Sequence, residues 1–290
     1  MAKSVRAASV PTACDDTAVS RHLNLRDRLR VVPRSTVRLA DLDAGATHGW
    51  TKAQADVELQ RGLDRLTALQ DRLWAEQKRP VLVVLQGIDA AGKDGSVRHV
   101  MSAFNPMGCI VTSFKAPTPV ELAHDYLWRV HQRVPGKGEI AIFNRSHYED
   151  VLIVRVHDLV PKSVWSRRYD QINAFEELLT SSGTTIVKFF LWIDRDEQRQ
   201  RFEDRLNDPA KRWKFRLGDL AERKLWDDYV AADEEILRRC STAAAPWYVI
   251  PANKKWFRNL AIADILADTL DELDPRYPPA PEDLTGVVVE

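Results

Sequence analysis

VLVVLQGIDAAGKDGS, residues 81–96, is the stretch from which the architecture of this chain can be inferred. Five apolar residues lead into the pattern G-x(4)-G-K, which is typical of a phosphate-binding P-loop between a buried strand and a helix. In such a loop the backbone N–H groups bind phosphate and the lysine reaches terminal phosphate oxygens. The strand-to-helix context favours this interpretation over a chance match in an ordinary turn.

Two carboxylates distinguish this loop from the usual one. Asp94 occupies the position after Lys93 where a Ser or Thr normally contacts magnesium, and Asp89 lies within the loop. A carboxylate among phosphates is tolerable only if a divalent cation neutralises part of the charge. We therefore expect Asp89 to bind Mg²⁺, or Mn²⁺ in its place, with Asp94 assisting. The residues expected to line the phosphates are Gly87, Ala90, Ala91, Gly92, Lys93, Asp94 and Gly95.

The composition favours a globular protein with one sizeable domain. The chain has 290 residues, of which 44% are hydrophobic and 29% charged, and its formal net charge is zero. A neutral chain does not favour a nucleic-acid partner, and no apolar run approaches the roughly 18–20 residues that span a bilayer. Cys14, Cys109 and Cys240 form no metal-binding or disulfide pattern. We expect a cytoplasmic protein without a nucleic-acid or membrane partner.

Short apolar runs alternate with amphipathic segments along the rest of the chain. Predicted strands cover 81–85, 109–114, 139–143, 185–193 and 246–251, and predicted helices cover 53–79, 92–104, 120–134, 165–180, 196–207, 219–239 and 260–273. Such alternation predicts an α/β fold with a parallel sheet and helices on both faces. We expect an N-terminal arm over 1–52, a P-loop domain over 53–273 and an irregular tail over 274–290.

The segment NRSHYED, residues 144–150, follows the predicted strand 139–143. A P-loop enzyme usually has an Asp at the end of a neighbouring strand to bind magnesium, but Asn144 carries no charge. The nearest anions are Glu149 and Asp150, and we predict Asp150 as the second magnesium ligand. The guanidinium of Arg145 suits bidentate phosphate binding.

The same segment has a structural interpretation that remains open. Ser146 can cap a helix, and Glu149 three residues later can complete a capping box. Both interpretations can hold together.

A charged segment, DRDEQRQRFEDR over 194–205, follows the predicted strand 185–193. Arg201 and Arg205 are four residues apart and share a helix face. The segment is either a solvated helix with internal ion pairs or part of a lid, about 196–224, that brings arginine across the phosphates and excludes water. Trp213 could stack on a base or anchor the lid to the core, and we expect the core role.

Three segments together resemble the second family of polyphosphate kinases. They are the loop 87–93, the segment 144–150, and 196–205 with KRWKF at 211–215, and the similarity runs from about 53 to 273. The resemblance implies a thymidylate-kinase-like P-loop fold with a helical lid. It also implies reversible, magnesium-assisted transfer of a terminal phosphoryl group between inorganic polyphosphate and a nucleotide.

Positions that match the family's motifs carry its expected roles. Asp89 and Lys93 match the loop Asp and Lys, Arg145 matches the Arg of the D-R-S or N-R-S segment, and Arg201 matches the lid Arg. Together with Asp150 these residues form the expected catalytic set. Arg205, Asn144 and Glu149 are expected to bind phosphate or nucleotide. Asn144 departs from the family pattern, since many members have Asp there.

The sequence HYED at 147–150 resembles that of the family branch whose members accept both nucleoside monophosphates and diphosphates. The expected acceptors are AMP and ADP or other purine nucleotides such as GMP and GDP, and we expect a homo-oligomer.

Two other functions remain as alternatives. An ATP-dependent nucleoside monophosphate kinase predicts Ser or Thr after Lys93, which is absent, and an adenine pocket for the donor. A P-loop switch without turnover predicts partner-facing loops, which the sequence does not identify.

Overall fold

The computed structural model describes residues 24–283, 285 and 287–289. Residues 1–23 of the expected arm, Cys14 among them, lie outside this part of the chain. Over the described residues the strands form one parallel sheet in the order β2-β3-β1-β4-β5. The strands are β1 (Val81–Gln86), β2 (Cys109–Ser113), β3 (Ile140–Asn144), β4 (Thr185–Trp192) and β5 (Trp247–Pro251). The predicted α/β class is confirmed.

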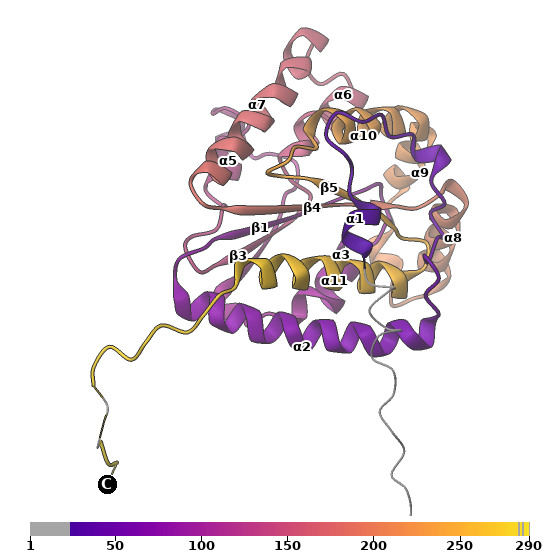
Figure 1. Cartoon of the computed structure of the whole chain (residues 1–290). Coiled ribbons are helices and arrows are strands. Elements are labelled where there is room, and N and C mark those ends of the chain that lie inside the picture. The colour runs from indigo at the N-terminus through magenta and orange to yellow at the C-terminus, as the bar shows by residue number, and fades with distance from the viewer. Residues whose placement is uncertain (1–23, 284, 286, 290) are drawn as a thin grey trace, which may run out of the picture.

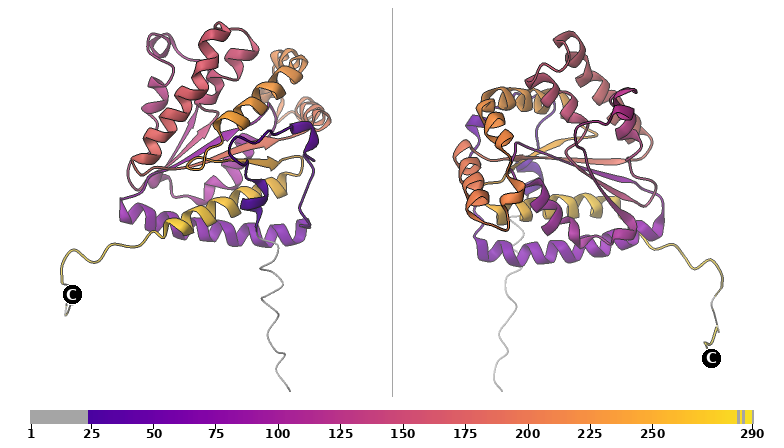
Figure 2. Two further views of the ribbon diagram at one scale, coloured as in Figure 1. Left: turned by 45° about the horizontal axis from the view of Figure 1, so that its top comes forward. Right: turned by 180° about the vertical axis from the view of Figure 1, so that it is seen from behind.

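Helices cover both faces of the sheet (Figures 1 and 2). The lower face in Figure 1 carries α2 (Lys52–Glu76), α3 (Lys93–His99) and α11 (Lys255–Leu273). The upper face carries α5 (Trp128–His131), α6 (Ile153–Val156), α7 (Lys162–Ser181) and α10 (Trp226–Cys240). At one end of the sheet lie α8 (Arg195–Asn207) and α9 (Leu217–Lys224). None of the helices in the described part of the chain is long and apolar enough to cross a bilayer.

Three predicted helices differ from the structure. The segment 120–134 contains two short helices, α4 (Pro119–Leu122) and α5, because the Asp125 carboxylate accepts the Leu127 N–H and forms a turn between them. The segment 219–239 divides at Leu225 into α9 and α10. The helix predicted over 92–104 is shorter in the structure: α3 ends at His99, and a 3₁₀ turn (Met101–Ala103) follows it.

Residues 24–50 pack on the body around β5 and α11. A helix, α1 (Leu25–Leu29), buries Leu25 and Leu29, and the Val31 N–H donates to the Trp247 carbonyl over 2.8 Å. The segment is too short for a hydrophobic period, so sequence patterns alone do not reveal it.

The central strands are buried on both faces, which explains why their sequences are almost wholly apolar. Lys188 in β4 is a charged exception. Its buried ammonium donates to Glu176 Oε2 (2.5 Å), the Tyr148 hydroxyl (2.8 Å) and the Cys240 carbonyl (2.7 Å). Tyr148 and His147 also contact Glu176 Oε1. This network fixes the turn after β3 to β4 and α7.

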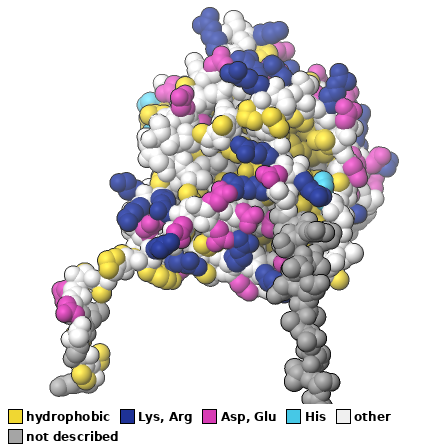
Figure 3. Space-filling model, in the orientation of Figure 1, with side chains coloured by type: hydrophobic (Ala, Val, Ile, Leu, Met, Phe, Trp, Pro, Cys, Tyr) yellow, Lys and Arg dark blue, Asp and Glu magenta, His cyan; other side chains and the backbone are white. Residues whose placement is uncertain are grey.

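The surface over α2 and α11 mixes charges of both signs instead of forming a single-sign patch (Figure 3). Arg65 of α2 binds Asp268 and Asp271 of α11. Asp264 lies in the same helix pair but is only 6% exposed, and its Oδ2 has no hydrogen-bond partner among the residues that the structure describes. Burial, and then the Asp268 charge, raise the pKa of Asp264 to about 7.

We expect Asp264→Asn to stabilise the protein at pH 8 and to have little effect near pH 4. The folded state retains a proton that the unfolded state releases above its ordinary pKa of 3.8. The unfolding free energy of the unmodified protein therefore falls as the pH rises from about 4 to about 7. Melting temperatures at the two pH values test this, and an equal shift at both would contradict it.

Candidate active site

The loop after β1 depends on left-handed backbone at two glycines. Gly87 has φ 145° and Gly92 has φ 112°, and a Cβ at Gly87 would lie 2.5 Å from the Leu191 carbonyl oxygen. Ala90 also has a positive φ, 68°, which is uncommon for a residue with a side chain and is concentrated at functional sites. The loop therefore has the tight curve that a phosphate cradle requires.

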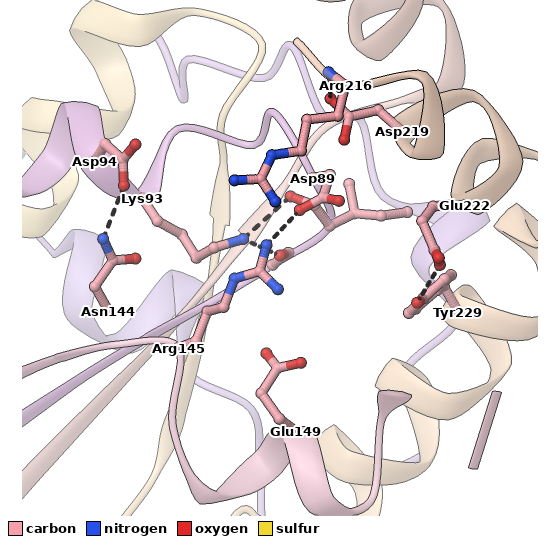
Figure 4. Close-up of polar contacts among 12 residues, drawn as sticks. Asp89, Lys93, Asp94, Asn144, Arg145, Glu149, Arg216, Asp219, Glu222 and Tyr229 are labelled. Carbon is pink, nitrogen blue, oxygen red and sulfur yellow. Dashed lines mark hydrogen bonds and ion pairs between the residues drawn. The ribbon is translucent and has the colours of Figure 1, made fainter. Parts of the chain in front are cut away.

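Lys93 crosses the mouth of this loop (Figure 4). Its ammonium donates to the carbonyl oxygens of Gly87 and Ile88. Burial, and then the nearby Arg145 charge, lower the pKa of Lys93. A phosphate anion bound in the loop would raise the pKa of Lys93 again, because a nearby negative charge favours the charged ammonium.

Asp89 and Arg145 form the central ion pair of the site (Figure 4). Arg145 Nη2 donates to Asp89 Oδ1 over 2.8 Å, and the two side chains are 40% and 35% exposed. Arg145 follows β3 with φ 64°, and its N–H donates to the Leu85 carbonyl. The strained turn directs the guanidinium toward the loop, so the structure brings Asp89, Lys93 and Arg145 together as expected.

Glu149, not Asp150, faces this ion pair. Figure 4 shows the Glu149 carboxylate pointing toward Arg145, and Gln86 Nε2 donates to Glu149 Oε1 over 3.1 Å. Glu149 lines a cavity of about 170 Å³ together with Asp89 and Arg145.

The structure does not bring Asp150 together with Asp89. Asp150 Oδ1 accepts from Arg168 over 3.0 Å and lines a separate cavity of about 480 Å³. The predicted α-helix from Ser146 is a 3₁₀ turn (His147–Asp150), in which neighbouring side chains diverge by a third of a turn. Ser146 does cap this turn, because its hydroxyl oxygen accepts the Tyr148 N–H. Glu149 does not complete a capping box with it.

Asp94 and Asn144 pair with each other at the edge of the site. Asn144 Nδ2 donates to Asp94 Oδ1 over 2.8 Å (Figure 4). The pair connects the first turn of α3 to the end of β3.

Arg201 lies beneath the loop instead of over it, contrary to the expected lid position. Its side chain is 6% exposed, and it donates to the carbonyls of Ala90, Ala91, Ala252 and Asn253 and to Glu197. The N–H groups that Arg201 directs at the loop therefore already donate to backbone carbonyl oxygens. Arg205 packs over Phe202 and lies 4.0 Å from Asp219, so it links α8 to α9.

Truncating Arg201 is expected to destabilise the fold. Arg201→Met leaves four carbonyls without their buried donor, which costs about 3 kcal/mol. We therefore expect a melting temperature about 6–12 °C lower, in line with about 2–4 °C per kcal/mol in a protein of this size. An unchanged melting temperature with a large loss of kcat would contradict this and would support the expected contact of Arg201 with the substrate phosphates.

Sequence reasoning missed several residues that complete the site. Gln198 is buried and donates to the Asp89 carbonyl while it accepts from Arg223. Its spacing of three from Arg201 on one helix face could have indicated it. Glu222 and Tyr229, joined by a 2.6 Å hydrogen bond, line the same cavity as Asp89. Trp213 is 76% exposed, so the expected core anchor is wrong.

Arg216 is a further missed residue, at the N-terminal end of α9. Figure 4 shows its side chain extending toward Asp89. It lies two residues after the basic run 211–214 in the sequence, and that position is the signal that could have found it.

The donor atoms suit a hard divalent cation. Asp89 and Glu149 offer carboxylate oxygens to the cavity, and Mg²⁺ is usually bound by one or two carboxylates plus substrate phosphates. Nowhere in the described ranges do three His, Cys, Asp or Glu side chains gather as a metal cage. The residues therefore fit a magnesium ion shared with phosphates.

A parallel sheet, a glycine loop with its lysine, and an arginine directly after the neighbouring strand β3 together are typical of a P-loop phosphotransferase. Residues 50–278 match the model of the family described as polyphosphate kinase 2. The chain belongs to the polyphosphate kinase 2 family.

Curated relatives and a solved structure agree with this assignment. The chain is 52% identical to an AMP/ADP-polyphosphate phosphotransferase of Meiothermus ruber, over 91% of this chain and 99% of the relative. It is 46% identical to an ADP-polyphosphate phosphotransferase of Rhodopseudomonas palustris, over 76% of this chain and 80% of the relative. The crystal structure of polyphosphate kinase 2 from Arthrobacter aurescens TC1 superposes with a TM-score of 0.86 at 46% identity, covering 90% and 94% of the two chains.

Proposed function

We propose that this protein transfers the terminal phosphoryl group of inorganic polyphosphate to AMP or ADP, in a reversible reaction. The proposal rests on one observation: Asp89 and Arg145 form an ion pair at a P-loop in which Asp94 replaces the usual Ser or Thr after the lysine. The relative with 52% identity is named for the same acceptors. An ATP-dependent monophosphate kinase or a nucleotide switch would not explain this loop.

The reaction needs positioning and charge neutralisation more than covalent chemistry. An oxygen of the acceptor phosphate attacks the terminal phosphorus of polyphosphate in line, and the bond to the shortened chain breaks. Lys93 and Arg145 bind the phosphoryl oxygens and stabilise the charge that they carry in the transition state. No nucleophilic side chain is required.

Asp89 and Glu149 would hold Mg²⁺, or Mn²⁺, together with substrate phosphates. The cation would neutralise charge between the two polyanionic substrates. Asp94 and Asn144 would support the loop from its edge, and Asp150 would take no part in holding the metal.

The cavity of about 480 Å³ suits the nucleoside part of the acceptor. Tyr126 and His124, which stacks on Trp128, bring aromatic surface to that cavity, and Asp150 and Arg168 bring hydrogen-bonding groups. These features fit AMP and ADP and also other purine nucleotides such as GMP and GDP.

The segment of about 196–224 would act as the lid of a phosphotransferase domain over 53–273, with the chain before and after it as an arm and a tail. Gln198 of α8 and Glu222 of α9 reach the cavity that contains Asp89. Arg216 takes the role expected of Arg201. Exposed Ile110 and Val111 on the edge strand β2 favour a homo-oligomer, and the cysteine content favours the cytoplasm.

Phosphorus NMR of the pure protein with ADP, MgCl₂ and polyphosphate tests transfer directly. We expect ATP signals to grow as the chain-end signal changes, without release of inorganic phosphate. Phosphate release without ATP would indicate hydrolysis, and an unchanged spectrum would indicate a binding protein.

A further inference from the structure

A second guanidinium, that of Arg258 in α11, lies directly behind the phosphate loop. Arg258 is 2% exposed. A Cβ built on Gly92 would lie 1.9 Å from Arg258 Nη1, and a Cβ built on Gly95 would lie 3.0 Å from Nη2. The absence of side chains at these two glycines therefore makes room for the guanidinium as well as for the curve of the loop.

Arg258 has no acidic partner among the described residues. Its Nε and Nη2 donate to Asn259 Oδ1, over 3.2 and 2.8 Å, and it forms no ion pair within that part of the chain. The charged group that affects its pKa is another cation, Arg201. Burial, and then Arg201, lower the pKa of Arg258 to about 10, so the group is still protonated at neutral pH.

The two arginines differ in how their charges are compensated. Arg201 binds Glu197 over 2.7 Å and donates to four carbonyls. Arg258 has a neutral amide oxygen as its acceptor. A buried cation without a counter-ion is costly to a folded protein, so its charge should be compensated by an anion that arrives with function.

We propose that Arg258 is a positioning residue that draws the phosphates of the substrate into the loop by its charge, through the glycine backbone. This role rests on the proposed function. The guanidinium touches the back of the loop at Gly92 and Gly95, while Lys93 and Arg145 lie on the substrate side. Only backbone separates its charge from the cradle, and in this water-poor position the field is weakly screened.

The proposal makes opposite predictions for stability and for ligand binding. Arg258→Met removes an uncompensated buried charge and keeps most of the side-chain volume. We expect the unliganded variant to melt at the same temperature as the unmodified protein or a few degrees higher. We also expect its Kd for inorganic tripolyphosphate with MgCl₂ to rise about tenfold.

Titration calorimetry on the full chain with tripolyphosphate measures this binding. Arg258→Lys retains the charge and should bind within about threefold of the unmodified protein. Arg238→Met removes a surface arginine whose partner is Glu235 and is the matched control, with no expected change.

The outcomes separate this inference from the proposed function. An Arg258→Met protein that binds tripolyphosphate as tightly as the unmodified protein would overturn the role of Arg258. Equal weakening in Arg258→Lys and Arg258→Met would also overturn it, because packing and not charge would then be responsible. If the unmodified protein bound no tripolyphosphate, the proposed function itself would fail.

Discussion

Asp89→Asn is expected to lower kcat by about two orders of magnitude or more. The carboxylate accepts from Arg145 at the mouth of the loop, and its charge acts on the cradle lysine, Lys93. An amide keeps the shape but loses the charge that we assign to magnesium binding. The loss should be greatest at limiting MgCl₂, so kcat is to be measured over a range of magnesium concentrations.

The same variant should fold normally, because the Asp89 side chain is 35% exposed and contributes little to the core. Asp170→Asn, on the exposed side of α7, is the matched control and should leave kcat unchanged. A near-normal rate for Asp89→Asn at limiting magnesium would remove Asp89 from the metal site.

Glu149→Gln is expected to have an effect of similar size on kcat, about a hundredfold. Glu149 faces Arg145 within the cavity that also contains Asp89, and Gln86 holds one of its oxygens. The amide would keep the hydrogen bond to Gln86 but offer no charge to a cation.

Asp150→Asn is the informative comparison, because the two carboxylates are neighbours in sequence but line different cavities. Removing the Asp150 charge leaves Arg168, whose side chain is 14% exposed, without its ion-pair partner, so we expect a lower melting temperature and a higher KM for the nucleotide. The kcat at saturation should stay within about fivefold of the unmodified value. A collapse of kcat in Asp150→Asn with normal turnover in Glu149→Gln would reverse our assignment.

Local patterns predicted the sheet and the loop, because a buried strand and a G-x(4)-G-K turn depend on nearby residues. The roles of Glu149 and Asp150 could not be predicted in this way. Adjacent side chains point to different sides of a turn, and the sequence does not show which side faces Arg145.

Contacts between distant segments were equally hidden. The spacing of Arg201 and Arg205 shows that they share a helix face, but it does not show which part of the protein that face contacts. The expected position of Arg201 over the phosphates is therefore wrong. Its partners come from the loop and from the end of β5. Arg258 lies more than 160 residues after Gly92, and only the packing of α11 against the loop brings them together.

The donor is the central point of the account, and a comparison of donors tests it most directly. The pure protein is given AMP and MgCl₂ with either inorganic polyphosphate or ATP at equal concentrations of transferable phosphoryl groups, and nucleotides are followed by chromatography. We predict rapid conversion of AMP to ADP with polyphosphate and at most a small fraction of that rate with ATP. Conversion with ATP and none with polyphosphate would contradict the account.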